Sequence, residues 1–180
     1  MKYFYKLWKI INELSESLLL GILFFILLTL TLQNYEVVGD SMVPNYDQGD
    51  RLLLLKFSYL KNPNSDDYIK PFNPKRGDVV VFKYPNNPDR KFIKRIIGVS
   101  GDTVKIYKGK VYLDDNQIKE AYLDNDKYKD LSDYGPFTIS RGHVFVLGDN
   151  RWVSNDSRNW GELSFDYIIG EPMIKYWPLN

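Results

Sequence analysis

An uncharged apolar run from Leu18 to Leu32, LLLGILFFILLTLTL, constrains this chain of 180 residues more than any other feature. Extended back to Leu14, the run approaches the ~20 residues that an α-helix needs to cross the hydrocarbon core of a bilayer. A buried core helix is another interpretation of such a run, but the charges at its flanks and its phenylalanines disfavour it. Residues 14–33 are therefore predicted to form a single transmembrane anchor.

The charges on either side of the run predict its orientation. Lysines precede it, at Lys2, Lys6 and Lys9. Acidic residues follow it, at Glu36 and Asp40. Because basic residues favour the cytoplasmic side of a membrane, we expect residues 1–13 to be cytoplasmic and residues 34–180 to lie outside the cell membrane. The lipid bilayer would then be a permanent partner of the chain.

A cleavable secretory signal has the same charged start and apolar middle as this segment. Such a signal ends in a small-x-small cleavage motif, and none follows the apolar run. The only alanine in the chain is Ala121, far from the run. An uncleaved anchor is therefore favoured over a cleaved signal.

The composition, 44% hydrophobic and 26% charged, is typical of one globular domain at this length. The formal net charge of +1 argues against a nucleic-acid partner, since such proteins carry a concentrated basic face. The chain has no cysteine and a single histidine, His143, which excludes disulfides, thiolate nucleophiles and histidine-rich metal sites. Any hydrolytic chemistry falls to Ser, Thr, Lys, Tyr, Asp or Glu.

Short runs bounded by turn residues follow the anchor, and no long stretch there has a helical period. The predicted strands are Arg51–Phe57, Asp78–Tyr84, Lys91–Ile97, Thr103–Tyr107, Lys110–Leu113, His143–Leu147 and Ile168–Tyr176. Lys108-Gly109 predicts a hairpin, and Asp114–Asn116 a further turn. Asn62–Asn73 and Asp124–Asp133 are polar and predicted to be surface loops. The expected fold is mostly β, an anchor helix followed by one antiparallel β domain at residues 34–180.

The segment Gly39-Asp40-Ser41-Met42-Val43-Pro44 lies just beyond the anchor. A glycine two residues before a serine allows a sharp turn and leaves backbone N–H groups near the hydroxyl, as an oxyanion hole requires. A serine in such a loop is more often only a turn residue, so this segment alone predicts little.

Lys94 lies in the middle of an apolar strand. Strand alternation places it on one face with Phe92 and Ile96. If that face is exposed, the lysine merely extends its amine to water. If the face is buried, desolvation disfavours the ammonium and lowers the pKa of Lys94 toward the value that a general base needs.

The segment Gly148–Gly161 is dense in polar side chains, flanked by glycines, and follows the apolar strand His143–Leu147. An Asp–Arg pair two residues apart in it could staple the loop, and a serine hydroxyl could hydrogen-bond a lysine amine. A surface loop with satisfied salt bridges is the competing interpretation.

Taken in order, these segments resemble the bacterial type I signal peptidases, a family of serine proteases with a Ser–Lys dyad. Gly39–Pro44 resembles the nucleophile box of that family, Arg76–Phe82 the box after it, Phe92–Gly98 the lysine box and Gly148–Gly161 the last box. The resemblance runs from the anchor nearly to the C-terminus. It implies a signal-peptidase-like catalytic β domain.

The resemblance also implies roles for individual residues. Ser41 would be the nucleophile, Lys94 the general base and Ser154 the residue that orients the lysine amine. Asp156 and Arg158 would form a supporting ion pair.

Some members of the family donate a serine hydroxyl to the oxyanion from two residues before the nucleophile. That position is Gly39 here, so only backbone donation is available there. The substrate would bind as an extended strand beside Tyr35–Asp40 and Lys91–Ile93. Its small-residue pockets would be lined by Tyr35, Val37, Met42, Phe92 and Ile93.

The chain departs from the family pattern in places. Asn45-Tyr46 follows Pro44 where the family usually has Thr-Leu, and Trp152-Val153 replaces a more polar pair in the last box. The segment Gly98–Asp102 lacks a proline that is usual before its second glycine. None of these changes removes a catalytic group, although the first could reshape a substrate pocket.

The reaction implied by the resemblance is removal of N-terminal signal peptides from exported preproteins after a small-x-small motif, with no metal or cofactor. The resemblance gives His143 no role. Two alternatives stay open: a sister Ser–Lys peptidase with a dedicated substrate, such as a conjugation-pilus maturation protease, and a membrane-anchored β domain that binds peptides without cutting them. Self-cleaving repressors share the dyad, but they carry a DNA-binding segment where this chain has an anchor.

Overall fold

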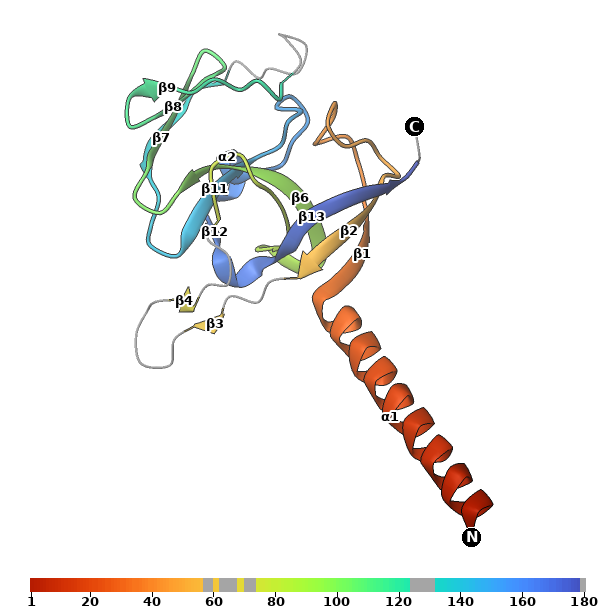
Figure 1. The fold of residues 1–180 in the computed structure, drawn as a ribbon. Helices are drawn as coiled ribbons and strands as arrows, with labels where there is room; N and C mark the ends of the chain where they lie inside the picture. Colours follow the sequence, from red (N-terminus) through yellow and green to blue (C-terminus); the bar gives the residue numbers. More distant parts are fainter. Residues whose placement is uncertain (57–59, 62–67, 70–73, 124–131, 179–180) are drawn as a thin grey trace.

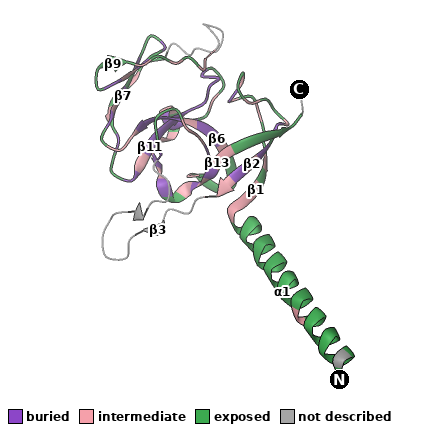
Figure 2. Ribbon diagram, viewed as in Figure 1, coloured by how far each residue is buried: buried purple, intermediate pink, exposed green. Residues whose placement is uncertain are grey.

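The computed structural model describes residues 1–56, 60–61, 68–69, 74–123 and 132–178. Helix α1 (Lys2–Thr31) leads directly into a β domain (Figure 1). The stretch Tyr3–Thr31 of this helix is long and apolar enough to span a membrane. None of the residues in its most apolar part is buried against the rest of the protein (Figure 2). The helix ends where Leu32 takes extended backbone angles, φ −113° and ψ 147°.

The larger sheet has seven strands, and each neighbouring pair in it is antiparallel. In spatial order they are β1 (Leu32–Glu36), β2 (Arg51–Lys56), β13 (Ile168–Trp177), β5 (Val79–Tyr84), β6 (Asn87–Val99), β11 (His143–Leu147) and β12 (Leu163–Ser164). A four-stranded antiparallel sheet contains, in order, β10 (Tyr134–Thr138), β7 (Thr103–Tyr107), β8 (Lys110–Leu113) and β9 (Asn116–Gln117). The short elements are β3 (Leu60–Lys61), β4 (Tyr68–Ile69), the helix α2 (Ser157–Trp160) and the 3₁₀ turn η2 (Phe165–Tyr167).

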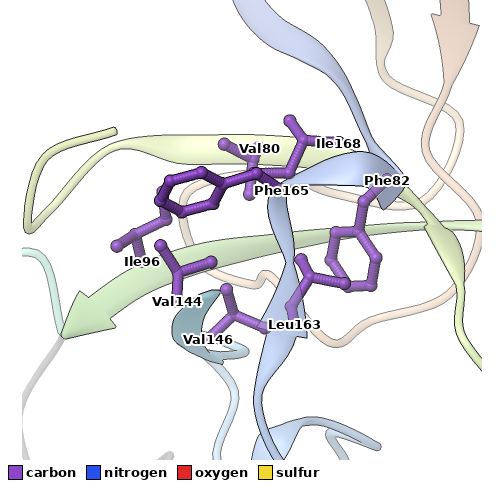
Figure 3. Packing of buried hydrophobic residues seen from close by; sticks show 8 residues of the cluster. All are labelled: Val80, Phe82, Ile96, Val144, Val146, Leu163, Phe165 and Ile168. Carbon is purple, nitrogen blue, oxygen red and sulfur yellow. The ribbon is translucent and has the colours of Figure 1, made fainter. Parts of the chain in front are cut away.

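Strand β11 is buried on both faces, and its alternating side chains enter different hydrophobic clusters. Val144 and Val146 pack with side chains of β5, β6 and the 163–168 segment (Figure 3). Phe145 and Leu147 pack against the apolar face of the four-stranded sheet. The continuous apolar run of β11 therefore joins the two sheets through one core.

A third cluster lies beneath the chain that connects β1 to β2. Its buried members are Val37, Met42, Leu52, Leu54, Val81 and Ile93. Because these side chains come from the β1–β2 connection, β2, β5 and β6, the cluster fixes that connection against the large sheet.

The predicted fold class is confirmed, and each predicted strand coincides with an observed one. Strand β6 is longer than predicted and runs from Asn87 to Val99. Pairing with β5 extends it at its start, and pairing with β11 extends it at its end. Both predicted turns are present, with Lys108, Asp114 and Asp115 at positive φ.

Several short elements did not follow from the sequence pattern. Strand β1 was missed because the apolar run was assigned to the anchor as far as Gln33, whereas Leu32 already pairs with Leu55. Strands β10 and β12 and the single turn of α2 are too short to show a period. Tyr68 and Ile69 form strand β4 inside a segment predicted to be a loop. The rest of that segment, residues 62–67 and 70–73, lies outside the described residues, as do residues 124–131 of the second predicted loop.

Candidate active site

The connection from β1 to β2 carries Ser41 in a tight turn over the third hydrophobic cluster. Gly39 has a φ of +82°, a left-handed conformation that glycine adopts at least cost. The amides of Asn45 and Tyr46 both donate to the carbonyl of Met42, each at 3.0 Å. The side chain of Met42 is fully buried, so the turn is held from below while Ser41 faces a cleft.

Lys94 reaches this turn from the middle of β6. Its amine Nζ lies 2.5 Å from Ser41 Oγ, and it donates to the carbonyl of Ile93 at 2.8 Å. Only 3% of Lys94 is exposed, and the ring of Phe92 lies 5.3 Å from Nζ. The predicted burial of Lys94 beside Phe92 is thus present in the structure.

Burial lowers the pKa of Lys94 from 10.5 to about 8 because desolvation penalises the ammonium. The carboxylates of Asp156 and Asp149 act in the opposite direction and limit the shift. A substantial fraction of this amine is therefore neutral in mildly alkaline solution, and a neutral amine can accept a proton from a neighbouring hydroxyl.

The segment after β11 approaches Ser41 from the other side. The amide of Asn150 donates to the carbonyl of Ser41 at 3.0 Å. A Cβ on Gly148 would lie 2.2 Å from Ser154 Oγ and 2.5 Å from the Ser41 carbonyl oxygen. Only glycine leaves room there, so Gly148 allows the segment Gly148–Gly161 to pack closely against the turn that carries Ser41.

Asp156 and Arg158 form the predicted ion pair. Asp156 is fully buried and accepts hydrogen bonds from the Arg158 guanidinium at 2.8 and 2.9 Å and from the Gly148 amide at 3.0 Å. It also caps α2, with Asn159 as the reciprocal partner. Arg158 donates to the carbonyl of Arg151 at 2.8 Å. The pair therefore holds the loop between Gly148 and Arg158 in shape around the site.

Ser154 has a buried hydroxyl that makes no hydrogen bond within the described part of the chain. Its position beside Gly148 places it next to the turn that carries Ser41. The predicted hydrogen bond from Ser154 to the lysine amine is not formed in this structure. A buried hydroxyl without a partner is costly, which makes Ser154 available to a group that enters the site.

A cleft of about 340 Å³ opens over the Ser41–Lys94 pair. It is lined by Val38, Gly39, Asp40, Ser41, Phe92, Lys94, Asn150, Val153 and Asn155. Of the predicted pocket residues, Phe92 lines this cleft. Val37, Met42 and Ile93 lie in the hydrophobic cluster beneath it, with Tyr35 packed against that cluster.

Sequence reasoning placed Val38 in the segment Tyr35–Asp40 beside the substrate, but it assigned no individual role to Asn150, Val153 or Asn155. These three residues lie within the polar segment Gly148–Gly161, so their nearness to the site had a signal in the sequence.

One edge of β6 is open next to the cleft. Strand β11 pairs with β6 from Arg95 to Val99, while β5 pairs with it along the other edge from Asn87 to Arg95. On the edge of β6 that faces β11, no described strand pairs with the residues that precede Arg95. An extended peptide can add to such an edge.

His143 lies at the start of β11, away from Gly148 at its other end. Its Nδ1 is 3.0 Å from the carbonyl oxygen of Arg141 and 3.9 Å from Glu162 Oε1. These are structural contacts outside the cleft. Among the described residues, no group of three or more His, Asp or Glu side chains has a metal-binding arrangement.

The chain is similar to known peptidases over almost its whole length. The family described as "Signal peptidase, peptidase S26" matches residues 10–177. A probable signal peptidase I-1 of Synechocystis sp. is 33% identical over 181 aligned residues, covering 96% of this chain and 86% of the relative. Signal peptidase I of Bacillus caldolyticus is 33% identical, covering 82% of this chain and 80% of the relative. A crystal structure of a signal peptidase I from Enterococcus faecalis is 29% identical, with a TM-score of 0.49, and the match covers 57% of this chain and 98% of that one.

Proposed function

This chain belongs to the signal peptidase family, peptidase S26, and from this membership we propose that Ser41 and Lys94 are its catalytic dyad. Members of the family are serine endopeptidases that remove signal peptides, so the substrates of this chain are preproteins that carry a signal peptide. The residues, the substrate position and the membrane orientation given below are part of the proposal.

The observation that carries the proposal is the 2.5 Å separation of Lys94 Nζ and Ser41 Oγ. The neutral Lys94 amine takes the proton of the Ser41 hydroxyl as Oγ attacks the scissile carbonyl. The Ile93 carbonyl accepts a hydrogen from the same amine and so directs its lone pair toward the hydroxyl. Lys94 then gives its proton to the leaving amine, and water hydrolyses the acyl-enzyme.

The backbone amide of Ser41 is the proposed donor to the oxyanion. Gly39 has no side-chain donor to add, as the sequence implied. The positive φ of Gly39 turns the chain immediately before Asp40 and Ser41. A fixed backbone donor of this kind stabilises charge that develops only in the transition state.

Ser154 is the proposed second partner of the lysine. Its buried hydroxyl has no hydrogen bond in the described structure and lies beside the nucleophile turn. A small movement when substrate binds would let it accept a hydrogen from the Lys94 amine. Asp156 and Arg158 support this position by holding the loop on both sides of Ser154.

The signal peptide is proposed to bind as an extended strand between the open edge of β6 and residues 38–40. Its alternate side chains would enter the cleft, where Val38, Phe92 and Val153 provide apolar walls. The limited size of this cleft favours the small residues of a small-x-small motif.

Helix α1 is proposed to cross the cell membrane once, with its N-terminus in the cytoplasm and the β domain outside. A helix of 30 residues is ~45 Å long, more than the ~30 Å hydrocarbon core. The excess length leaves the first turns, with Lys6 and Lys9, in the cytoplasmic headgroup region. The cleft then lies on the side where the cleavage site of an exported preprotein emerges.

Cleavage of a preprotein by the detergent-solubilised chain tests the dyad. We expect Ser41→Ala and Lys94→Ala each to lower kcat by at least about 10³-fold, because each removes a group that acts in the transition state. Ser100→Ala and Lys105→Ala are matched controls outside the cleft and should retain full activity. A Ser41→Ala or Lys94→Ala variant with near-normal cleavage contradicts the dyad, and binding without any cleavage by the unaltered chain would point to a binding module.

A further inference from the structure

The segment Glu120–Tyr122, which follows β9, contacts a residue of each of the three segments that form the candidate site. We call this segment the brace. Its contacts are with Asn45 after the nucleophile, Arg95 after the lysine, and Arg151 in the last box. Sequence reasoning assigned no role to Glu120, Tyr122 or Arg95.

On the nucleophile side, Asn45 joins the turn to the brace and to the last box at once. Its side-chain Nδ2 donates to the carbonyl of Tyr122 and to Asp149 Oδ2, both at 2.8 Å. Asn45 lies in the turn that the Met42 carbonyl organises, four residues after Ser41. It also stands where the family usually has threonine, so this double contact is a feature of this chain.

On the lysine side, Arg95 follows Lys94 directly and pairs with the same aspartate. Its Nε and Nη2 donate to Asp149 at 2.8 and 2.7 Å. Its guanidinium carbon lies 4.1 Å from the centre of the Tyr122 ring, a cation–π contact. Asp149 is fully buried, so Asn45 and Arg95 meet at one shared carboxylate shielded from water.

The third contact fixes the last box. Arg151 is only 4% exposed, and its charge is paired with Glu120, which lies 31 residues earlier in the chain. Arg151 Nε donates to the carbonyl of Gly148 at 2.8 Å, and the Tyr122 hydroxyl donates to Glu120 at 2.7 Å. A buried arginine needs such a partner, so the brace holds the turn that carries Asp149.

We propose that the brace sets the distance between Ser41 and Lys94, and that Asn45 is the positioning residue through which it acts on the nucleophile turn. This inference rests on the proposed dyad. An error of 1 Å in the position of a reacting group can cost ~10²-fold in rate.

Substitution of Asn45 tests the proposal without disturbing the core, because Asn45 lies at the surface. Asn45→Ala should lower kcat about ten-fold with little change in KM. Asn45→Asp should lower it further, because its carboxylate would face Asp149 and the Tyr122 carbonyl. Asn116→Ala is the matched control, since Asn116 donates to the carbonyl of Asp114 in a hairpin outside the cleft.

A second readout follows the lysine itself. The pH dependence of Lys94 acetylation by acetic anhydride, read by mass spectrometry, reports the pKa of that amine. We expect the midpoint to rise from about 8 toward 10.5 in the uncharged Asn45→Ala variant, because a turn displaced from Lys94 would admit water to the amine, and to stay unchanged in Asn116→Ala. Asp149 and Asp156 face the amine in each variant.

An unchanged kcat together with an unchanged Lys94 midpoint in Asn45→Ala would overturn the proposal. A loss of kcat that only matches a loss of folded protein, measured by circular dichroism, would also overturn it. Failure of the dyad is seen separately, as cleavage that survives Ser41→Ala. If the dyad fails, the acetylation midpoint still reports whether the brace controls the surroundings of the Lys94 amine, because acetylation does not depend on catalysis.

Discussion

At the scale of single residues, the site depends on a lysine held in a place that disfavours its charge. Lys94 has a pKa of about 8 in the folded chain against an ordinary value of 10.5. Between about pH 8 and pH 10.5, Lys94 binds more protons in the unfolded chain than in the folded chain. The free energy of unfolding that this group contributes therefore rises with pH in that range. Below about pH 8, burial of the ammonium costs about 3 kcal/mol of folding stability.

Lys94→Met should therefore remove activity and raise stability. We expect its free energy of unfolding near neutral pH to exceed that of the unaltered chain by about 2–3 kcal/mol. The difference should shrink as pH rises from about 8, and its pH-dependent part should vanish only above 10.5, where Lys94 is neutral in both states. Chemical denaturation of the detergent-solubilised chain across this range measures it, with the exposed Lys105→Met as control. A stability difference that is the same at every pH would show that Lys94 is not buried as a cation.

How much of the site the sequence could predict also depends on the residue. Ser41 and Lys94 were predicted because short motifs place them, and the structure brings them together. Val37, Met42 and Ile93 were expected in a substrate pocket but are buried beneath it, since alternation along a strand does not say which face meets the cleft. Glu120 and Tyr122 carry no local signal, because their partners lie far away in the sequence.

At the scale of elements, helix α1 and the seven-stranded sheet are joined without a linker. Helix α1 ends at Thr31, and Leu32 already pairs with Leu55 of β2. Lys56, at the end of β2, donates from Nζ to the carbonyl of Thr29 at 2.8 Å. That carbonyl belongs to the last turn of the helix, where carbonyl groups have no partner within the helix and a cation is favourable. The sheet therefore sits at a fixed height above the helix end.

A short Gly-Ser linker inserted between Thr31 and Leu32 should let the β domain move relative to the end of helix α1. We expect cleavage of a preprotein embedded in lipid vesicles to fall by about ten-fold or more, because the cleft is no longer held at the level of the cleavage site. Cleavage of a soluble signal-peptide substrate in detergent should be unchanged. The same linker placed at the exposed Asp115 turn serves as control. Equal rates on the membrane-embedded substrate before and after insertion at Thr31 would refute the fixed height.

At the scale of the whole molecule, the sequence predicted the parts better than their arrangement. The apolar run predicted α1, and the period-2 runs predicted the principal strands of an antiparallel fold. The position of β13 between β2 and β5 was not predictable, because β13 pairs with two strands that lie far from it in the sequence. That pairing places the last strand of the chain beside β2, the second strand of the β domain (Figure 1). It builds the sheet on which the β1–β2 connection presents Ser41 to Lys94.

The central claim is that a neutral Lys94 activates Ser41, and the dependence of kcat/KM on pH tests it most directly. For a signal-peptide substrate measured from about pH 5 to 10, kcat/KM should rise ten-fold per pH unit in acid and level off through an apparent pKa of about 8, the value of the buried amine. The rise reflects loss of the proton from the ammonium, which cannot accept another. A flat profile with chemistry rate-limiting, or a rise centred near ~6.5 as an ordinary histidine would produce, would contradict the claim.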